Sequence, residues 1–169
     1  MMKKISLALL LAAALSACSP QYDWRDYRST DAPYAVLFPG KPASQTRSIR
    51  LDTLSVEMTM TAAEVDGVIF AVGSAQLPDA AQGPAAIAAM KSALVNNIGA
   101  TVTSSKSSAD ARQATLDVEA KGSRNGEALR LIGHFIARDK RIYQVIVMGR
   151  DKHIVQDQVE TYLSSFKLN

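Results

Sequence analysis

The chain has 169 residues, a formal net charge of +3, two histidines and one cysteine. A chain of this length forms about one domain and buries enough surface to fold without a disulfide or a structural metal. Lys3 and Lys4 supply most of the excess positive charge, so the rest of the chain lacks the concentrated basic face of a nucleic-acid-binding protein. Two histidines without a Cys/His cluster also argue against a structural zinc site.

Residues 1–17 have the layout of a secretory signal peptide. Lys3 and Lys4 precede Ile5–Ala17, a stretch of thirteen residues without any charge. A helix that spans a bilayer needs about twenty apolar residues. We therefore expect this segment to direct export and not to remain as a transmembrane anchor.

The residues Leu15, Ser16, Ala17 and Cys18 resemble the lipobox of bacterial lipoprotein precursors. The resemblance implies cleavage before Cys18, a diacylglyceryl group on its sulfur, and an acylated amino terminus. Ser19, in place of an aspartate, resembles lipoproteins that are sent to the outer membrane. We therefore predict a lipoprotein that faces the periplasm and is held at the membrane by covalent lipid on Cys18, since several acyl chains give lasting attachment.

Other interpretations of Cys18 are an ordinary signal peptide with a chance cysteine, half of a disulfide, or a catalytic thiol. A disulfide has no second cysteine to pair with. A catalytic thiol would lie beside a membrane, with no histidine near it in the sequence.

After Cys18, we predict a tether over residues 18–32 and a single domain over residues 33–169. Tyr22, Trp24 and Tyr27 alternate with Arg25 and Arg28 in the predicted tether. These side chains can rest among lipid headgroups as membrane-proximal contacts, or the rings can cover a sheet edge or a helix seam. We favour the second interpretation, because lone aromatic side chains usually bury area.

The first half of the domain has the pattern of strands. A short strand is predicted at residues 34–38, followed by a turn at Pro39-Gly40. Apolar residues alternate with polar ones from Leu54 to Ala62, which indicates a long strand with one dry face. Asp66-Gly67 then predicts a hairpin with a strand at residues 68–72.

The second half begins with a helix over residues 84–98, since Ile87, Met90 and Leu94 recur at helical spacing. A polar, Ser-rich connection is predicted before residue 114. Alternating strands follow at residues 114–120 and 129–137, then an apolar strand at residues 142–148. Asp151 can cap a last helix that runs through Phe166.

This order predicts the α+β class, a mostly antiparallel sheet with two packed helices. It resembles the Mog/PsbP-like fold, and in particular small bacterial lipoproteins of the DcrB type. Three features carry the resemblance besides the mid-chain helix: the opening Tyr34–Pro42, the Asp66-Gly67 hairpin and the closing Tyr162–Leu168. The resemblance implies a binding or assembly module and provides no catalytic residue.

The two histidines are weak candidates for a ligand site. His134 shares a predicted strand face with Arg130, Ile132, Ile136 and Arg138, and can be a metal ligand or a pH sensor. We interpret it as a half-exposed strand residue, because one imidazole without neighbouring carboxylates or thiols binds metal poorly. His153, near the start of the last helix, is a weaker candidate.

Five basic residues flank the last strand: Arg138, Lys140, Arg141, Arg150 and Lys152. They can gather at one end of the sheet and contact lipid phosphate or an acidic protein, or they can be ordinary solvated turn residues. We favour the second interpretation.

We find no catalytic pattern in the sequence. Gly73-Ser74-Ala75 lies inside a strand pattern and lacks the Gly-x-Ser-x-Gly elbow of a serine hydrolase. Phosphate-binding loops and paired carboxylates at catalytic spacing are also missing. We therefore expect no enzymatic activity, no cofactor and no metal.

The predicted function is a lipid-anchored scaffold of the cell envelope that binds an envelope protein. The alternative is a carrier or sensor of an apolar, lipid-like ligand. A carrier needs a hollow lined by residues such as Met58, Met60, Ile87 and Phe135, whereas a scaffold packs the same residues solid.

Overall fold

The computed structural model describes residues 21–169. The predicted signal peptide, the cleavage motif Leu15–Ala17 and the lipidation site Cys18 lie outside the described residues. In chain order the elements are β1 (Arg25–Arg28), β2 (Tyr34–Phe38), β3 (Ala43–Leu51), β4 (Leu54–Val65), β5 (Val68–Gln76), the 3-10 turn η1 (Ala80–Gln82), α1 (Gly83–Asn97), β6 (Ala100–Ala109), β7 (Gln113–Arg124), β8 (Glu127–Arg138), β9 (Arg141–Arg150), the 3-10 turn η2 (Asp151–His153), α2 (Gln156–Ser165) and β10 (Lys167–Leu168).

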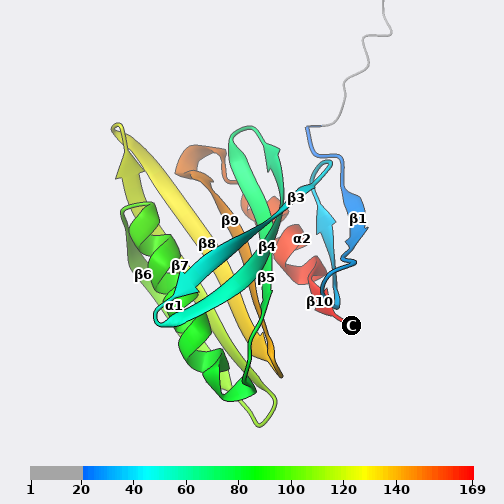
Figure 1. Cartoon of the computed structure of the whole chain (residues 1–169). Helices are drawn as coiled ribbons and strands as arrows, with labels where there is room; N and C mark the ends of the chain where they lie inside the picture. The colour runs from blue at the N-terminus through cyan, green and yellow to red at the C-terminus, as the bar shows by residue number, and fades with distance from the viewer. Residues whose placement is uncertain (1–20) are drawn as a thin grey trace, which may run out of the picture.

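A large sheet of seven strands forms the middle of the domain (Figure 1). Its order is β3-β4-β5-β9-β8-β7-β6, and every neighbouring pair is antiparallel. The predicted hairpin turn at Asp66-Gly67 is confirmed, since these residues have φ values of 51° and 73°. Asn125 and Gly126, between β7 and β8, have values of 52° and 78°. Such left-handed conformations suit two-residue turns between twisted strands.

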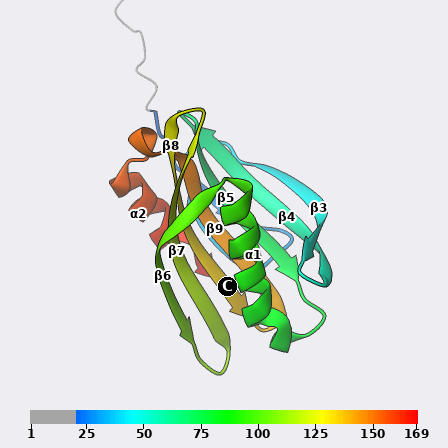
Figure 2. The ribbon, with the colours of Figure 1, turned by 90° about the vertical axis from the view of Figure 1, so that its left-hand side faces the viewer.

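Helix α1 covers one face of the large sheet (Figure 2). The predicted helix over residues 84–98 is confirmed to within one residue at each end. Ile87 and Met90 are buried against Met58, Leu131 and other aliphatic side chains of the sheet. This face therefore forms a continuous aliphatic core.

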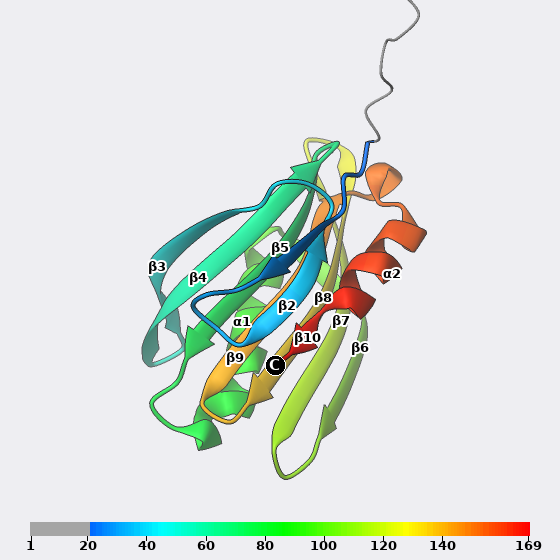
Figure 3. The same cartoon turned by 90° about the vertical axis from the view of Figure 1, so that its right-hand side faces the viewer.

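The opposite face is covered by smaller pieces (Figure 3). A second sheet, β1-β2-β10, and helix α2 enclose a cluster that is rich in aromatic rings. Tyr34, Phe38, Phe70, Tyr143 and Tyr162 are each 2% exposed or less. The prediction of a mostly antiparallel α+β fold with two packed helices is confirmed.

The predicted polar connection before residue 114 is wrong, because strand β6 occupies Ala100–Ala109. This strand pairs with β7 along its length and forms one edge of the large sheet. Nine of its ten residues are exposed, so no apolar alternation marks it in the sequence. Its main-chain pairing with β7 holds it in place.

The prediction of a tether over residues 18–32 is wrong for its second half. Strand β1 pairs with β2, from Arg25 opposite Phe38 to Arg28 opposite Ala35. The Asp23 amide also donates a 3.0 Å hydrogen bond to the Pro39 carbonyl. The folded domain therefore begins well before residue 33.

Helix α2 begins later than predicted. Residues Asp151–His153 form the turn η2, and Val155 precedes the first helical residue in an extended conformation. The Asp151 carboxylate does not cap α2; it lies 4.0 Å from the guanidinium of Arg130. The helix ends at Ser165, one residue before the predicted end.

Candidate functional site

A polar groove runs between α2 and the uncovered half of the large sheet. Helix α2 contacts β2 and β9, while the surfaces of β6 and β7 on that side stay open (Figure 3). The groove has two parts, one of about 260 Å³ over the strands and one of about 650 Å³ along the helix. Ile132 and Leu163 line both parts and form an apolar strip at their junction. We refer to the two parts together as the α2 groove.

Two side-chain pairs form the strand side of the α2 groove. His134 on β8 lies directly opposite Asp117 on β7, and its Nδ1 contacts the Asp117 carboxylate. Glu119 lies two residues after Asp117 on β7, and its Oε1 accepts a hydrogen bond from Arg130 Nε at 2.9 Å. The Glu119 and Arg130 side chains are 31% and 20% exposed, so this second pair is partly shielded from water. Both pairs hold charged groups at defined positions on the sheet.

The α2 groove is acidic overall. Its lining includes the carboxylates of Asp117, Glu119, Asp157 and Glu160. Lys106 lines the groove as well, Arg130 pairs with Glu119, and His134 contacts Asp117, so the carboxylates still outnumber the lysine and arginine by two. Glu160 accepts a hydrogen bond from Gln156 at 3.1 Å and faces no cation among the described residues. An apolar strip bordered by excess negative charge is suited to bind a partner that presents apolar and basic side chains.

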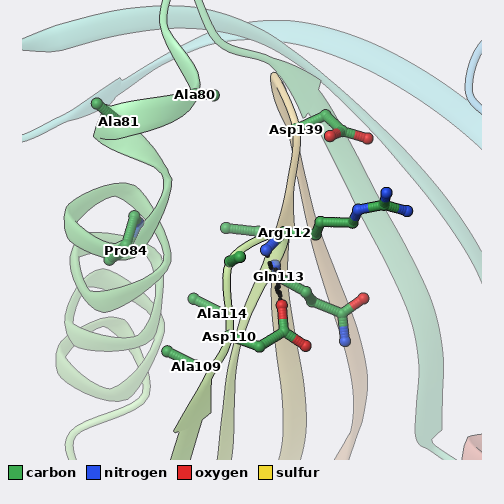
Figure 4. A pocket seen from close by; sticks show the side chains of 11 residues that line it. Ala80, Ala81, Pro84, Ala109, Asp110, Arg112, Gln113, Ala114 and Asp139 are labelled. Carbon is green, nitrogen blue, oxygen red and sulfur yellow. Dashed lines mark hydrogen bonds between the residues drawn. The ribbon is translucent and has the colours of Figure 1, made fainter.

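A second groove, of about 310 Å³, lies between the start of α1 and the β6–β7 turn (Figure 4). Its walls are mostly alanines. The polar groups on its rim serve the fold, since Asp110 Oδ1 accepts hydrogen bonds from the amides of Arg112 and Gln113 at 2.7 and 2.9 Å. These backbone hydrogen bonds, with Arg112 the larger contributor, lower the pKa of Asp110. The carboxylate stabilises the turn and is not aimed at a ligand.

A third groove, of about 510 Å³, lies between α1 and the tip of the β3–β4 hairpin. Its lining comes from the turn residues Leu51–Leu54 and from small side chains of α1. The residues that a carrier would need around a hollow lie elsewhere. Met58, Ile87 and Phe135 are buried at 4%, 3% and 0% exposure, and Met60 packs against the same cluster.

Close packing continues around Gly73 on β5. A Cβ atom at this position would lie 2.6 Å from Met60 Sδ and 2.7 Å from Gln144 Cγ. The buried Gln144 amide donates to Met60 Sδ at 3.3 Å. The residues proposed to line a hollow are therefore packed solid, as a scaffold requires and a carrier does not.

The aromatic residues of the predicted tether, Tyr22, Trp24 and Tyr27, lie at the domain surface, where their rings pack on buried side chains of the core. Tyr22 and Trp24 stack with centroids 6.1 Å apart, and both rings approach Phe70 edge-on. Tyr27 contacts Phe38 in the same manner at 5.5 Å. Trp24 thus buries area, as the favoured interpretation requires, but it does so on β5, an interior strand, and not at a sheet edge.

Arg25 and Arg28, which alternate with these rings, are exposed. Arg25 pairs with Asp23 at 2.5 Å on the surface. Both guanidinium groups are thus open to solvent beside the packed aromatic segment.

The five basic residues do not gather at one end of the sheet. The β8–β9 turn is flanked by Arg138, Lys140 and Arg141. At the opposite end of β9, Arg150 is the last strand residue and Lys152 lies in η2. Arg150 and Lys152 both contact the Glu127 carboxylate, at 2.7 and 3.5 Å. A ten-residue strand separates the two groups by about 30 Å.

The remaining candidates have structural roles. His153 Nδ1 contacts the Asp66 carbonyl at 2.9 Å and the Asp66 carboxylate at 3.2 Å, which joins η2 to the β4–β5 turn. Ser74 is buried inside β5, opposite Tyr143.

Residues 21–169 contain no group of three or more His, Cys, Asp or Glu side chains placed to hold a metal ion. Within the same range, no helix is long and apolar enough to cross a bilayer.

The carboxylates of the α2 groove were not among the sequence candidates, although a signal for them exists. The Asn125-Gly126 turn pairs Arg124 with Glu127, and counting back along both strands places Asp117 opposite His134. His134 has no carboxylate near it on its own strand, but strand pairing places Asp117 of β7 beside it. Nothing in the sequence signals the contribution of α2, because it depends on tertiary packing.

No protein-family model and no curated protein sequence matches this chain. Among solved structures, it is similar to the solution structure of cyanobacterial PsbP (CyanoP) from Synechocystis sp. PCC 6803. The TM-score is 0.56 at 12% sequence identity, and the match covers 92% of this chain and 99% of that one. The crystal structure of PA94, a protein of unknown function from Pseudomonas aeruginosa, matches at 14% identity over 76% of this chain and 84% of that one, with a TM-score of 0.36 that is too low to indicate a shared fold. The domain therefore has a PsbP-like fold: a mostly antiparallel sheet packed with two helices.

Proposed function

We propose that this protein is a lipoprotein of the bacterial envelope whose domain binds a protein partner through the α2 groove. Residues 1–17 act as the signal peptide, and Cys18 carries the lipid that holds the chain at the outer membrane, on the periplasmic side. The support for the anchor is the sequence itself: two lysines, an uncharged stretch, and small residues before a single cysteine.

One observation carries the binding role. Helix α2 covers only part of its sheet face, and the groove beside it combines the apolar strip of Ile132 and Leu163 with an excess of carboxylates. Surfaces with an apolar centre and a charged border are typical of protein interfaces. The partner therefore presents a basic segment with apolar side chains to the groove.

A role in binding, and not in catalysis, accords with the chemistry of this groove. Two of its carboxylates, Asp117 and Glu119, are paired with His134 and Arg130, and the buried Ser74 lies within a strand of the sheet. The PsbP-like fold and the resemblance to DcrB-type lipoproteins point in the same direction, toward a module that acts by contact. Anchoring to a surface raises the effective concentration of such a module near other envelope components.

The anchor is tested by mass spectrometry of the protein purified from its native membranes. We expect a mature chain that begins at Cys18 with a thioether-linked diacylglyceryl group. The substitution Cys18→Ala should block processing, and the variant should leave the membrane fraction. An unmodified thiol on the mature protein, or unchanged membrane partitioning of the variant, would contradict the anchor.

The binding role is tested by crosslinking in the native envelope, with a photoreactive residue at Thr161 on the groove side of α2. The variant Asp117→Lys reverses one groove charge, and we expect it to weaken capture of the crosslinked partner at least about fivefold, or ~1 kcal/mol. Glu64→Lys makes the same charge change at an exposed position on β4, outside the groove, and should leave capture unchanged. Equal capture by both variants would refute the groove as the docking surface.

A further inference from the structure

The described chain starts at one end of the domain, which we call the proximal end. This end contains the β4–β5 turn at Asp66-Gly67, the β7–β8 turn at Asn125-Gly126, and η2 (Figures 1 and 3). Side-chain contacts tie these pieces together: His153 to Asp66, and Lys152 to Glu127. The opposite, distal end contains the β8–β9 turn, at the far end of a twelve-residue strand. The two ends are therefore about 35–40 Å apart.

The point at which the chain enters the domain is held by core contacts. Tyr22 and Trp24 are half-buried against Phe70, and the Asp23 amide is bonded to Pro39. Lengthening the tether would require these rings to leave the aromatic cluster. Burial of aromatic area opposes that change by a few kcal/mol.

The tether that remains is short. Cys18 and Tyr22 are four residues apart, and even a fully extended chain spans at most about 14 Å over that distance. A domain that stood on its distal end would hold Tyr22 about 35 Å above the headgroups, which is beyond this reach. If Cys18 carries the lipid, the proximal end must therefore stay near the bilayer.

The exposed apolar side chains are found toward the same end. Val155, at 48% exposure, lies between η2 and α2, and Val102, at 36%, is the third residue of β6, which starts at the proximal end. These are the two large apolar side chains that are exposed among residues 21–169. The basic side chains of Arg150 and Lys152 share one carboxylate, that of Glu127, and Arg124 is exposed at the neighbouring β7–β8 turn, so this end can present basic side chains to lipid phosphates.

From these observations we propose that the proximal end is a bilayer-contact surface, which holds the strands of the large sheet upright on the membrane. The proposal rests on the lipid anchor of the proposed function. In this orientation Val155 and the neighbouring turns contact the headgroup layer. The α2 groove then runs up the side of the domain, open to the periplasm along its length.

The orientation is tested by fluorescence quenching with an imposed anchor. The chain from Cys18 onward is coupled through its only thiol to a maleimide phospholipid in phosphatidylethanolamine–phosphatidylglycerol vesicles. A fluorescent non-natural amino acid replaces either Arg124 or Arg138, two exposed arginines that each precede a two-residue turn, at opposite ends of the domain. Circular dichroism confirms that both labelled chains fold. The quencher is a nitroxide attached to the lipid headgroup.

We expect quenching at position 124 to exceed that at position 138 at least about threefold, because the two sites differ in height by the length of a strand. Equal quenching, or stronger quenching at position 138, would overturn the orientation. Because the anchor is imposed chemically, this result does not depend on natural lipidation. Failure of the natural anchor would instead be seen as an unmodified Cys18 in mass spectrometry.

Discussion

The two faces of the large sheet are covered in different ways. One face is closed by a single fifteen-residue helix, α1, over an aliphatic core. The other is closed by a ten-residue helix and three short strands over an aromatic core, which leaves β6 and β7 open on that side. The long helix covers the central strands of its face and leaves grooves only at its start and beside the β3–β4 hairpin, whereas short pieces from both chain ends leave two whole strands open at their border. The α2 groove lies at this border, so the proposed binding surface is a consequence of incomplete coverage.

The largest effect should come from a charge placed in the aliphatic face. We expect Met58→Asp to unfold the domain, because burial of an unpaired carboxylate removes about 4 kcal/mol or more from a domain whose total stability is typically 5–15 kcal/mol. Urea denaturation monitored by circular dichroism measures the change. Ser55→Asp, at an exposed position of the same strand, should keep the wild-type midpoint. An unaltered midpoint for Met58→Asp would show that this face is not the sealed one.

Alanine substitutions in the aromatic face should lower the stability of the domain nearly as much at its centre and less at its border. Phe70→Ala should destabilise the domain by about 3–5 kcal/mol, as is usual for a buried phenylalanine. Trp24→Ala should lower stability by about 1–2 kcal/mol, because the indole is only half-buried. In a double-mutant cycle the two rings should couple by about 0.5–1.5 kcal/mol. Arg25→Ala, at an exposed position of β1, serves as the control.

A Trp24→Ala variant with wild-type stability would contradict the incorporation of residues 22–28 into the aromatic core. In that case this stretch would behave as the tether that its polar composition predicts.

The aromatic face should also make the protein sensitive to alkali. Burial raises the pKa of Tyr34, Tyr143 and Tyr162 above the ordinary value of 10.0, most of all for Tyr162. Each phenol then ionises more readily in the unfolded chain than in the folded one. Stability is therefore full below pH 10 and falls as the pH rises above it, by about 1.4 kcal/mol per pH unit for each fully shifted group.

Urea denaturation at pH 8 and at pH 11 measures this loss, and Tyr162→Phe should reduce it. An equal loss in the variant and the wild type would show that Tyr162 is ionised equally easily in both states.

The smallest effect should separate two tyrosines of the same cluster. The Tyr162 hydroxyl is buried and has no hydrogen-bond partner among the described residues, so Tyr162→Phe should be neutral or stabilise by up to about 1 kcal/mol at pH 7. At Tyr34 the Thr61 side chain opposes the rise in pKa that burial causes, so we expect Tyr34→Phe to destabilise by about 0.5–1.5 kcal/mol. Thermal unfolding of both variants distinguishes them. Equal changes would indicate that both hydroxyls are bonded.

The face that α1 seals could be predicted well from sequence. The alternation from Leu54 to Ala62 and the helical spacing of Ile87, Met90 and Leu94 each belong to one continuous segment. Short turns between neighbouring strands then determine the register, as at Asn125-Gly126. Local sequence patterns were therefore sufficient to predict most of the elements on this face.

The other face could be predicted only in part. Strands β3 and β6 are edges, mostly exposed, and their Ser- and Thr-rich sequences have no dry face to detect. Strand β1 is four residues long and acquires its place by pairing with β2 and by the packing of Trp24 on Phe70. The α2 groove combines β7, β8 and a helix near the chain end, so its shape depends on long-range packing. The register from the Asn125-Gly126 turn could place Asp117 opposite His134, but nothing in the sequence places α2 beside them.

The direction of β1 has a mechanical consequence. The strand begins beside Phe38, near the entry of the chain, and runs away from that end toward Ala35. A pull applied at Gln21 therefore acts along the strand, while its hydrogen bonds to β2 lie across the direction of force. Such a shearing load strains all these bonds together, whereas a peeling load would break them one at a time. Strand β1 is thus oriented to resist a pull on the N-terminal side of the domain.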